Sequence, residues 1–306
     1  MNNLFKNRFL PFILLGLIVS EIMYGQDLKT NDLKIKDRVW TAEEKEIIAT
    51  VERFLSVAGN YDFNAMREMI IEKAIVGIVR LKDGKRTTAN MTIEEYFEGV
   101  NNRKIRPYFE PVTEYTIHVD DGHLAFIRAD ATLYAYGVPQ SHNIDYFTLI
   151  KENGVWRFIS LSYTATPIPD DEKVFDLNIF GKSYAQAWCS QRPDFVSLFY
   201  AENGSLTVNN GMPAVGRDEI SKVAESFMTA FPDIIVSMDS LVKTTDGVKF
   251  HWTFTGTNTG ANGTGNKVKI NGAELWQLDD EGLIKESNGR FDAEEYDRQL
   301  KYGVDK

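Results

Sequence analysis

Residues 268–278 have the sequence VKINGAELWQL and give the clearest indication of the fold. Apolar and polar side chains alternate along this stretch, which is typical of a β-strand that buries one face. A turn at Glu281-Gly282 leads to a second alternating run over residues 283–291, and an earlier run at 248–257 precedes a glycine-rich loop. These runs predict an antiparallel meander of long strands.

Helical periodicity precedes this meander. Apolar stripes at helical spacing occupy residues 174–188 and 220–231, and a short helix is expected near Asp194 between them. Helices beside an antiparallel sheet make an α+β domain, in which the sheet buries one face under the helices. We therefore expect a cone-shaped domain of three N-terminal helices on a curved antiparallel sheet. The mouth of such a cone is the default ligand site.

The same order of features occurs once earlier in the chain. Thr41 and Glu44 form a capping box ahead of a long apolar-striped helix, and alternating runs follow over residues 115–163. The turn glycine Gly122 lies 125 residues before Gly247, its counterpart in the second copy. A nearly constant offset of this kind indicates duplication, so we expect two tandem domains.

The N-terminus has the layout of a secretory signal peptide. Lys6 and Arg8 precede an apolar run over residues 9–19, and small or turn-forming residues follow around Gly25. We expect export to the periplasm or the cell exterior. The predicted organisation is a signal peptide at 1–25, a lead-in at 26–40, a first domain at 41–166, a linker at 167–171 and a second domain at 172–302.

Charge and residue counts exclude several functions. The chain has 34 Lys and Arg against 44 Asp and Glu, a net charge of -10 that disfavours nucleic acid as a partner. Cys189 is the only cysteine, and the four histidines show no ligand spacing. We therefore expect no metal site and no organic cofactor, and no membrane association once the signal peptide is removed.

Four short motifs in the second half follow the order seen in a known family. They are residues 216–220 (GRDEI), 230–233 (AFPD), 252–257 (WTFTGT) and 279–284 (DDEGLI). On these motifs, residues 172–300 resemble the SnoaL-like polyketide cyclases of the nuclear transport factor 2-like superfamily. The first half resembles the broader superfamily through residues 145–150 (DYFTLI) and 153–157 (NGVWR). The resemblance implies cone-shaped α+β domains, in a group of isomerases, cyclases, binding scaffolds and dimerisation modules.

Glu274 is the strongest candidate for chemistry. It shares a strand face with Trp276 and other apolar residues, so a carboxyl group is placed in an apolar wall. Desolvation there raises the pKa of a carboxyl group toward neutrality, as a general acid or base requires. In SnoaL-like cyclases an acidic residue at this place resembles the catalytic acid or base. The alternative is that Glu274 lies near the rim of the cone, where its carboxyl group is solvated or paired with Arg290.

Asn258 is the candidate polar partner of Glu274, because it shares a strand face with Trp252 and its amide could hydrogen-bond a carbonyl oxygen. SnoaL-like cyclases often have histidine there, and asparagine cannot shuttle a proton. The alternative is a turn residue that begins the glycine-rich loop. Four aromatic residues are expected either to line the ligand site or to fill the core: Phe250, Trp252, Phe254 and Trp276.

The first half of the sequence contains fewer candidate site residues. His142 and Asp145 fall on opposite strand faces, so they form no dyad, whereas Arg128 and Asp130 share a face that lies either inside or outside the cone. We expect this domain to be mainly a scaffold or binding module.

Two hypotheses remain from the sequence. The first is a small apolar or carbonyl-bearing ligand in the second cone, with or without cyclase-type or isomerase-type proton transfer. The second is a noncatalytic scaffold or interaction module, in which the two sheets pair within the chain or the chain forms homo-oligomers. A cavity of about 300 Å³ or more around Glu274 would favour the first hypothesis, and a filled cone would favour the second.

Overall fold

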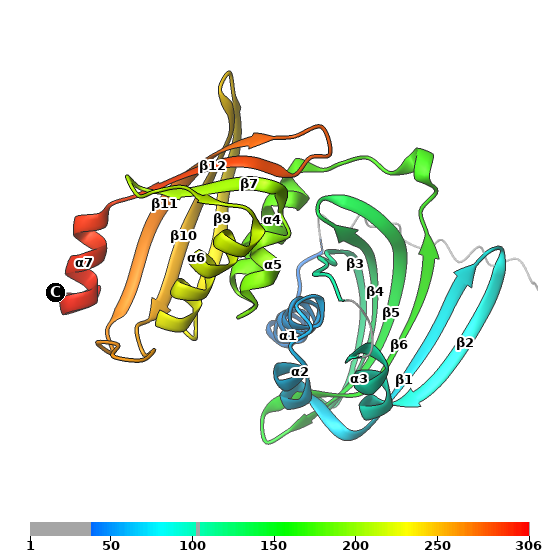
Figure 1. Cartoon of the computed structure of the whole chain (residues 1–306). Helices are drawn as coiled ribbons and strands as arrows, with labels where there is room; N and C mark the ends of the chain where they lie inside the picture. The colour runs from blue at the N-terminus through cyan, green and yellow to red at the C-terminus, as the bar shows by residue number, and fades with distance from the viewer. Residues whose placement is uncertain (1–37, 102–104, 306) are drawn as a thin grey trace, which may run out of the picture. The chain divides into compact units, whose positions relative to one another are not determined.

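The computed structural model describes residues 38–101 and 105–305 (Figure 1). The predicted signal peptide and most of the predicted lead-in lie outside these residues. Within the described part of the chain, no helix is both long and apolar enough to cross a membrane.

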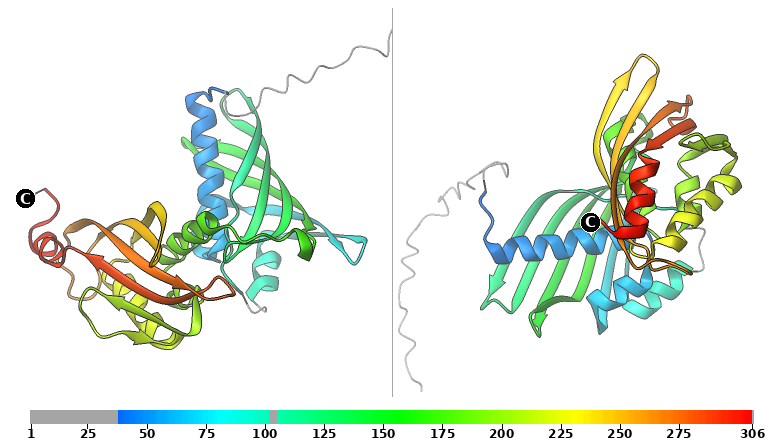
Figure 2. Two further views of the ribbon diagram at one scale, coloured as in Figure 1. Left: turned by 90° about the horizontal axis from the view of Figure 1, so that it is seen from above. Right: turned by 90° about the vertical axis from the view of Figure 1, so that its left-hand side faces the viewer.

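The first domain has three helices and a six-stranded sheet of order β2-β1-β6-β5-β4-β3. Neighbouring strands are antiparallel except β1 and β6, which are parallel. In both views of Figure 2, α1 runs beside the curved strands of this sheet. The elements are α1 (Ala42–Gly59), α2 (Phe63–Met69), β1 (Ile70–Lys82), β2 (Lys85–Thr92), α3 (Ile93–Asn101), β3 (Val112–Asp120), β4 (Leu124–Ala135), β5 (Val138–Glu152) and β6 (Val155–Pro167).

The second domain repeats this plan with the sheet order β8-β7-β12-β11-β10-β9 and a parallel pair at β7 and β12. A short 3-10 helix at Asp170–Glu172 precedes it. The elements are α4 (Leu177–Trp188), α5 (Pro193–Ser197), β7 (Tyr200–Val208), β8 (Ala214–Val215), α6 (Arg217–Ala230), β9 (Ile235–Thr244), β10 (Gly247–Thr257), β11 (Lys267–Leu278), β12 (Ile284–Phe291) and α7 (Ala293–Tyr302). The prediction of two tandem α+β cones is confirmed.

Helix starts follow the side-chain caps. Thr41 accepts a hydrogen bond from the backbone N–H of Glu44 at 3.1 Å, and the Glu44 side chain accepts one from the Thr41 N–H at 2.9 Å. Asp176 caps α4 in the second domain by accepting from two backbone N–H groups. The predicted start of that helix at Val174 is therefore too early, and Val174 is exposed.

The sheets contain strands that the sequence interpretation did not include. In each domain two strands lie between the second and third helices, β1 and β2 in the first and β7 and β8 in the second. The parallel pairing with the last meander strand extends each sheet beyond the predicted meander. This extension matters because β1 and β2 supply part of a cavity wall in the first domain.

Each domain has its own apolar core. In the first, the rings of Phe54 and Phe158 lie 4.6 Å apart between α1 and the sheet. In the second, Phe250 and Trp276 stack at 4.5 Å, and Tyr184 from α4 meets Trp276 edge-on at 5.2 Å. Large aromatic side chains thus occupy the interior of the second cone, so little space remains there.

Candidate functional site

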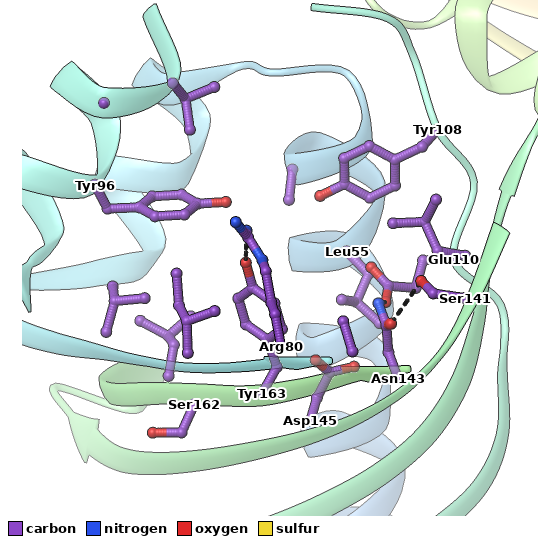
Figure 3. A pocket seen from close by; sticks show the side chains of 18 of the residues that line it. Leu55, Arg80, Tyr96, Tyr108, Glu110, Ser141, Asn143, Asp145, Ser162 and Tyr163 are labelled. Carbon is purple, nitrogen blue, oxygen red and sulfur yellow. Dashed lines mark hydrogen bonds between the residues drawn. The ribbon is translucent and has the colours of Figure 1, made fainter. Parts of the chain in front are cut away.

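The first domain contains a cavity of about 660 Å³. Its walls are largely apolar, with side chains from α1, α3 and the sheet, and a small set of polar groups faces into it (Figure 3). The polar lining residues include Arg80, Tyr96, Arg106, Tyr108, Glu110, Asn143, Asp145 and Tyr163. An apolar cavity of this size with a few convergent polar groups is typical of a small-molecule site.

Strand register brings several of these polar groups to the inner face of the sheet. Asn143 and Asp145 have the same parity on β5 as the buried Phe147, so all three point inward. Asp145 lies opposite Tyr163 on β6, and the next inward position on β6, Ala165, lies opposite Arg80 on β1. Three neighbouring strands therefore present an acid, a phenol and a guanidinium to one cavity.

Glu110 joins this set from the segment before β3. Its side chain accepts a hydrogen bond of 2.5 Å from the Asn143 amide, and Asn143 in turn accepts one from the Ser141 hydroxyl at 2.8 Å. Glu110 is only 9% exposed. Burial raises the pKa of Glu110 to about 7, although the hydrogen bond from Asn143 acts in the opposite direction.

Asp145 carries the one buried side-chain polar atom of the described cavity lining that has no hydrogen-bond partner. It is 5% exposed, and its Oδ2 atom has no hydrogen-bond partner among the described residues. Burial raises the pKa of Asp145 to about 8, and the negative charges of Glu110 and Asp130 contribute to the increase. A carboxyl group with this pKa is mainly protonated at neutral pH and can donate a hydrogen bond.

Phenol and guanidinium groups occupy another part of the cavity. Arg80 donates a hydrogen bond of 2.5 Å to the Tyr163 hydroxyl, and the Tyr96 hydroxyl points toward the same guanidinium (Figure 3). Burial raises the pKa of Tyr96 and of Tyr108, so both phenols stay protonated near neutral pH. This part of the cavity is rich in hydrogen-bond donors.

In the second domain, Glu274 lies on the inner wall of the cone and is 6% exposed. Its Oε2 atom accepts three hydrogen bonds, from Trp276 Nε1 at 2.8 Å, Ser287 Oγ at 2.7 Å and the Tyr184 hydroxyl at 3.2 Å. Burial raises the pKa of Glu274, and these hydrogen bonds oppose the increase. The alternative partner, Arg290, donates instead to Asn210.

The space beside Glu274 is small. A cavity of about 60 Å³ is lined by Glu274, Trp252 and Phe254 among others, whereas Phe250 and Trp276 stack on each other and are not part of its lining. This volume is far below the roughly 300 Å³ that a typical ligand site needs. The second cone is therefore filled, which was the outcome we associated with the scaffold hypothesis.

Comparisons with known proteins agree with the duplicated architecture. Residues 42–164 match the family described as "Putative lumazine-binding", and residues 179–300 match the SnoaL-like polyketide cyclase family. The chain contains two tandem nuclear transport factor 2-like domains. The predicted resemblance is confirmed, and we call the two halves the lumazine-binding-like domain and the SnoaL-like domain. This fold binds small molecules and often carries cyclase or isomerase activity.

Solved structures show the same kind of similarity at low identity. One is a protein of ketosteroid isomerase-like fold from Catenulispora acidiphila in complex with trimethylamine, with 18% identity, 38% of this chain and 88% of that chain covered, and a TM-score of 0.35. Another is described as a SnoaL-like polyketide cyclase from Jannaschia sp. CCS1, with 13% identity, 41% and 81% covered, and a TM-score of 0.32. No curated protein sequence matches the chain.

Asn258 lies apart from Glu274 in the SnoaL-like domain. Its side chain accepts a hydrogen bond of 2.8 Å from the backbone N–H of Thr264 and donates one of 3.1 Å to the carbonyl of Ala230. It is not among the residues that line the small cavity. Both ends of the amide are thus engaged in holding the loop between β10 and β11.

The polar residues of the larger cavity were not selected from the sequence. Asp145 could have been found, because it shares inward parity with Phe147 just as Glu274 does with Trp276. No alternation of side chains could have indicated Glu110, since it lies in an irregular segment.

Arg128 and Asp130 form an ion pair. They lie on the outer face of the sheet, since the intervening Ala129 is buried. Within residues 38–101 and 105–305, no group of three or more His, Cys, Asp or Glu side chains is arranged to hold a metal ion.

Proposed function

We propose that the lumazine-binding-like domain binds a small, largely apolar molecule that carries a carbonyl oxygen, and that Asp145 and Glu110 lie beside that oxygen. The observation that carries this proposal is the buried Asp145 carboxyl group, whose Oδ2 lacks a hydrogen-bond partner on the wall of a cavity of about 660 Å³. An unpaired polar atom in a buried position is costly, and a ligand acceptor would satisfy it.

The two carboxyl groups are suited to proton transfer next to a carbonyl group. Burial raises the pKa of both groups toward neutrality, to about 7 for Glu110 and about 8 for Asp145, so near neutral pH the pair can hold one proton between its two carboxyl groups. The protonated acid can donate to the carbonyl oxygen, and the ionised one can accept a proton from the adjacent carbon. This is cyclase-type or isomerase-type chemistry that uses only the protein's own side chains.

The proposal assigns the two domains different roles. Our expectation from the sequence placed the ligand beside Glu274 in the SnoaL-like domain, where the cavity is only about 60 Å³. We propose that this domain acts chiefly as a scaffold or interaction module, and Glu274 stays a candidate acid or base for a test of its own. Export through the predicted signal peptide, to the periplasm or outside the cell, is also part of the proposal.

The test uses β-tetralone, an apolar ketone with acidic protons beside its carbonyl group. Binding is measured by calorimetry, and proton transfer by the rate at which those protons exchange in D₂O. Wild-type protein is expected to bind β-tetralone and to accelerate exchange, and Asp145→Asn to lose most of the acceleration. Folded wild-type protein that fails to bind would overturn the proposal.

A pair of neighbouring substitutions locates the site. Ala165 lines the cavity, whereas Thr164 has the opposite parity on β6 and does not line it. Ala165→Phe is therefore expected to fill the cavity and abolish β-tetralone binding, and Thr164→Phe to leave it unchanged. Equal binding by the two variants would place the ligand elsewhere.

A further inference from the structure

The β1–β2 hairpin presents a row of cations on the face that forms the cavity wall. Cross-strand partners share a face, so the pairs Val76 and Met91, Ile78 and Ala89, Arg80 and Thr87, and Lys82 and Lys85 follow one another from the apolar wall to the hairpin tip. All of these residues except Lys82 and Lys85 line the cavity. The row changes from apolar to basic as it leaves the cavity.

Arg80 is the only cation of this row that lines the cavity, and its charge is not neutralised by the protein. None of the ion pairs among the described residues includes Arg80. Its hydrogen bond to the Tyr163 hydroxyl engages a neutral group and helps to fix the guanidinium at the cavity. The Asp83 carboxylate lies in the turn at the hairpin tip, beyond Lys82.

The neighbouring groups are neutral donors. The Tyr163 oxygen accepts from Arg80, which leaves its own proton free to donate, and the Tyr96 hydroxyl points toward the guanidinium (Figure 3). A guanidinium and two phenols together offer one positive charge and several N–H and O–H donors. This set complements a singly charged group with two acceptor oxygens.

We infer that the ligand of this cavity is a carboxylic acid, with its carboxylate bound by Arg80 and the Tyr163 and Tyr96 hydroxyls and its apolar body along the wall toward Asp145. A doubly charged phosphate fits less well, because this donor set supplies only one positive charge. Lys82 and Lys85 extend the positive potential outward and would attract the anion toward the mouth. The inference rests on the proposed ligand role of this cavity and adds the substrate class.

The test compares two probes of nearly equal shape, phenylbutyrate and its neutral amide, phenylbutyramide, by calorimetry on the full chain. We expect wild-type protein to bind phenylbutyrate at least about ten-fold more tightly than phenylbutyramide. Arg80→Met is expected to abolish this preference, because it should weaken the binding of phenylbutyrate much more than that of phenylbutyramide. Arg80→Lys keeps the positive charge but loses the paired N–H donors of the planar guanidinium, so it should retain only part of the preference for phenylbutyrate.

Two matched substitutions serve as controls. Arg86 lies on the opposite face of the same hairpin, opposite Leu81, and Arg106 is the other arginine that lines the cavity. Both Arg86→Met and Arg106→Met should keep the preference for phenylbutyrate. Loss of the preference in Arg106→Met but not in Arg80→Met would overturn the assignment, as would tighter binding of phenylpropyl phosphate than of phenylbutyrate.

The outcomes separate this inference from the proposed function. Wild-type protein that binds β-tetralone but shows equal affinity for phenylbutyrate and phenylbutyramide would overturn the carboxylate assignment alone. Wild-type protein that binds none of the three compounds would overturn the ligand role of the cavity itself.

Discussion

Asp145 and Glu110 are buried carboxyl groups on the wall of one cavity, where burial raises the pKa of Asp145 and the negative charge of Glu110 raises it further. They differ in their partners, because Glu110 accepts a hydrogen bond from Asn143 whereas Asp145 Oδ2 accepts none. Such an arrangement is costly for folding when both groups are ionised. Its consequences can be measured without knowledge of the ligand.

Asp145 should make the protein less stable as pH rises. Its pKa increases from about 3.8 in the unfolded chain to about 8 in the folded protein, so the folded state binds the proton more tightly between these values. The free energy of unfolding that this group contributes therefore falls as pH rises from 4 to 8. Asp145→Asn should remove that part of the decrease in urea unfolding at pH 5 and pH 8. The exposed Asp120→Asn is the control, and an equal pH dependence in Asp145→Asn and wild type would contradict the prediction.

Removal of the Glu110 charge should make Asp145 more acidic. Glu110→Gln keeps a side-chain oxygen for the Asn143 amide but carries no charge, so the pKa of Asp145 is expected to fall from about 8 toward its usual range. Carbon-13 NMR of the Asp145 carboxyl group over a pH titration measures the change directly. A pKa that stays at about 8 would mean that burial and the charge of Asp130 account for the increase without Glu110.

The cone architecture could be predicted because its signals are local. Capping residues such as Thr41, helical stripes and alternating strands each depend on a few neighbouring residues. The strands β1 and β2 were missed for physical reasons. The run AIVGIV within β1 is continuously apolar, a pattern that periodicity cannot assign, and β2 is an almost wholly exposed edge strand without alternation.

The site was harder to predict, because parity shows which way a side chain points and not whether space lies in front of it. Parity placed Glu274 correctly on an inner wall, but side chains from other elements, such as Tyr184 of α4, fill the cone beside it. In the first domain the corresponding volume is open. Glu110 joins its partners only through tertiary folding, since 33 residues separate it from Asn143.

The Asn258 side chain should stabilise the loop between β10 and β11. Asn258→Ala removes an acceptor from the Thr264 N–H and a donor from the Ala230 carbonyl, at an expected cost of roughly 1–3 kcal/mol. Amide hydrogen exchange at Thr264 should become faster. Asn258→Asp keeps the acceptor and should protect Thr264 better than alanine does. Unchanged exchange in Asn258→Ala would contradict a structural role for Asn258. It would instead support the role predicted from the sequence, that of a polar partner for a ligand.

Glu274 should contribute mainly to the stability of the SnoaL-like domain. Its Oε2 atom receives all three hydrogen bonds, so Glu274→Gln can place its amide oxygen there at a cost of about 1 kcal/mol. Glu274→Ala leaves the buried Trp276, Ser287 and Tyr184 donors without that acceptor and should cost roughly 3 kcal/mol or more. Urea unfolding measures both effects.

The same two variants separate a structural from a catalytic role for Glu274. Because the cavity beside Glu274 is about 60 Å³, both variants should bind β-tetralone and accelerate its proton exchange as the wild-type protein does, at temperatures where they are folded. Asp145→Asn is the matched comparison, since it alters the larger cavity. If Glu274→Gln lost the acceleration while Asp145→Asn kept it, the acid or base would belong to the SnoaL-like domain, as the alternation around Trp276 first indicated.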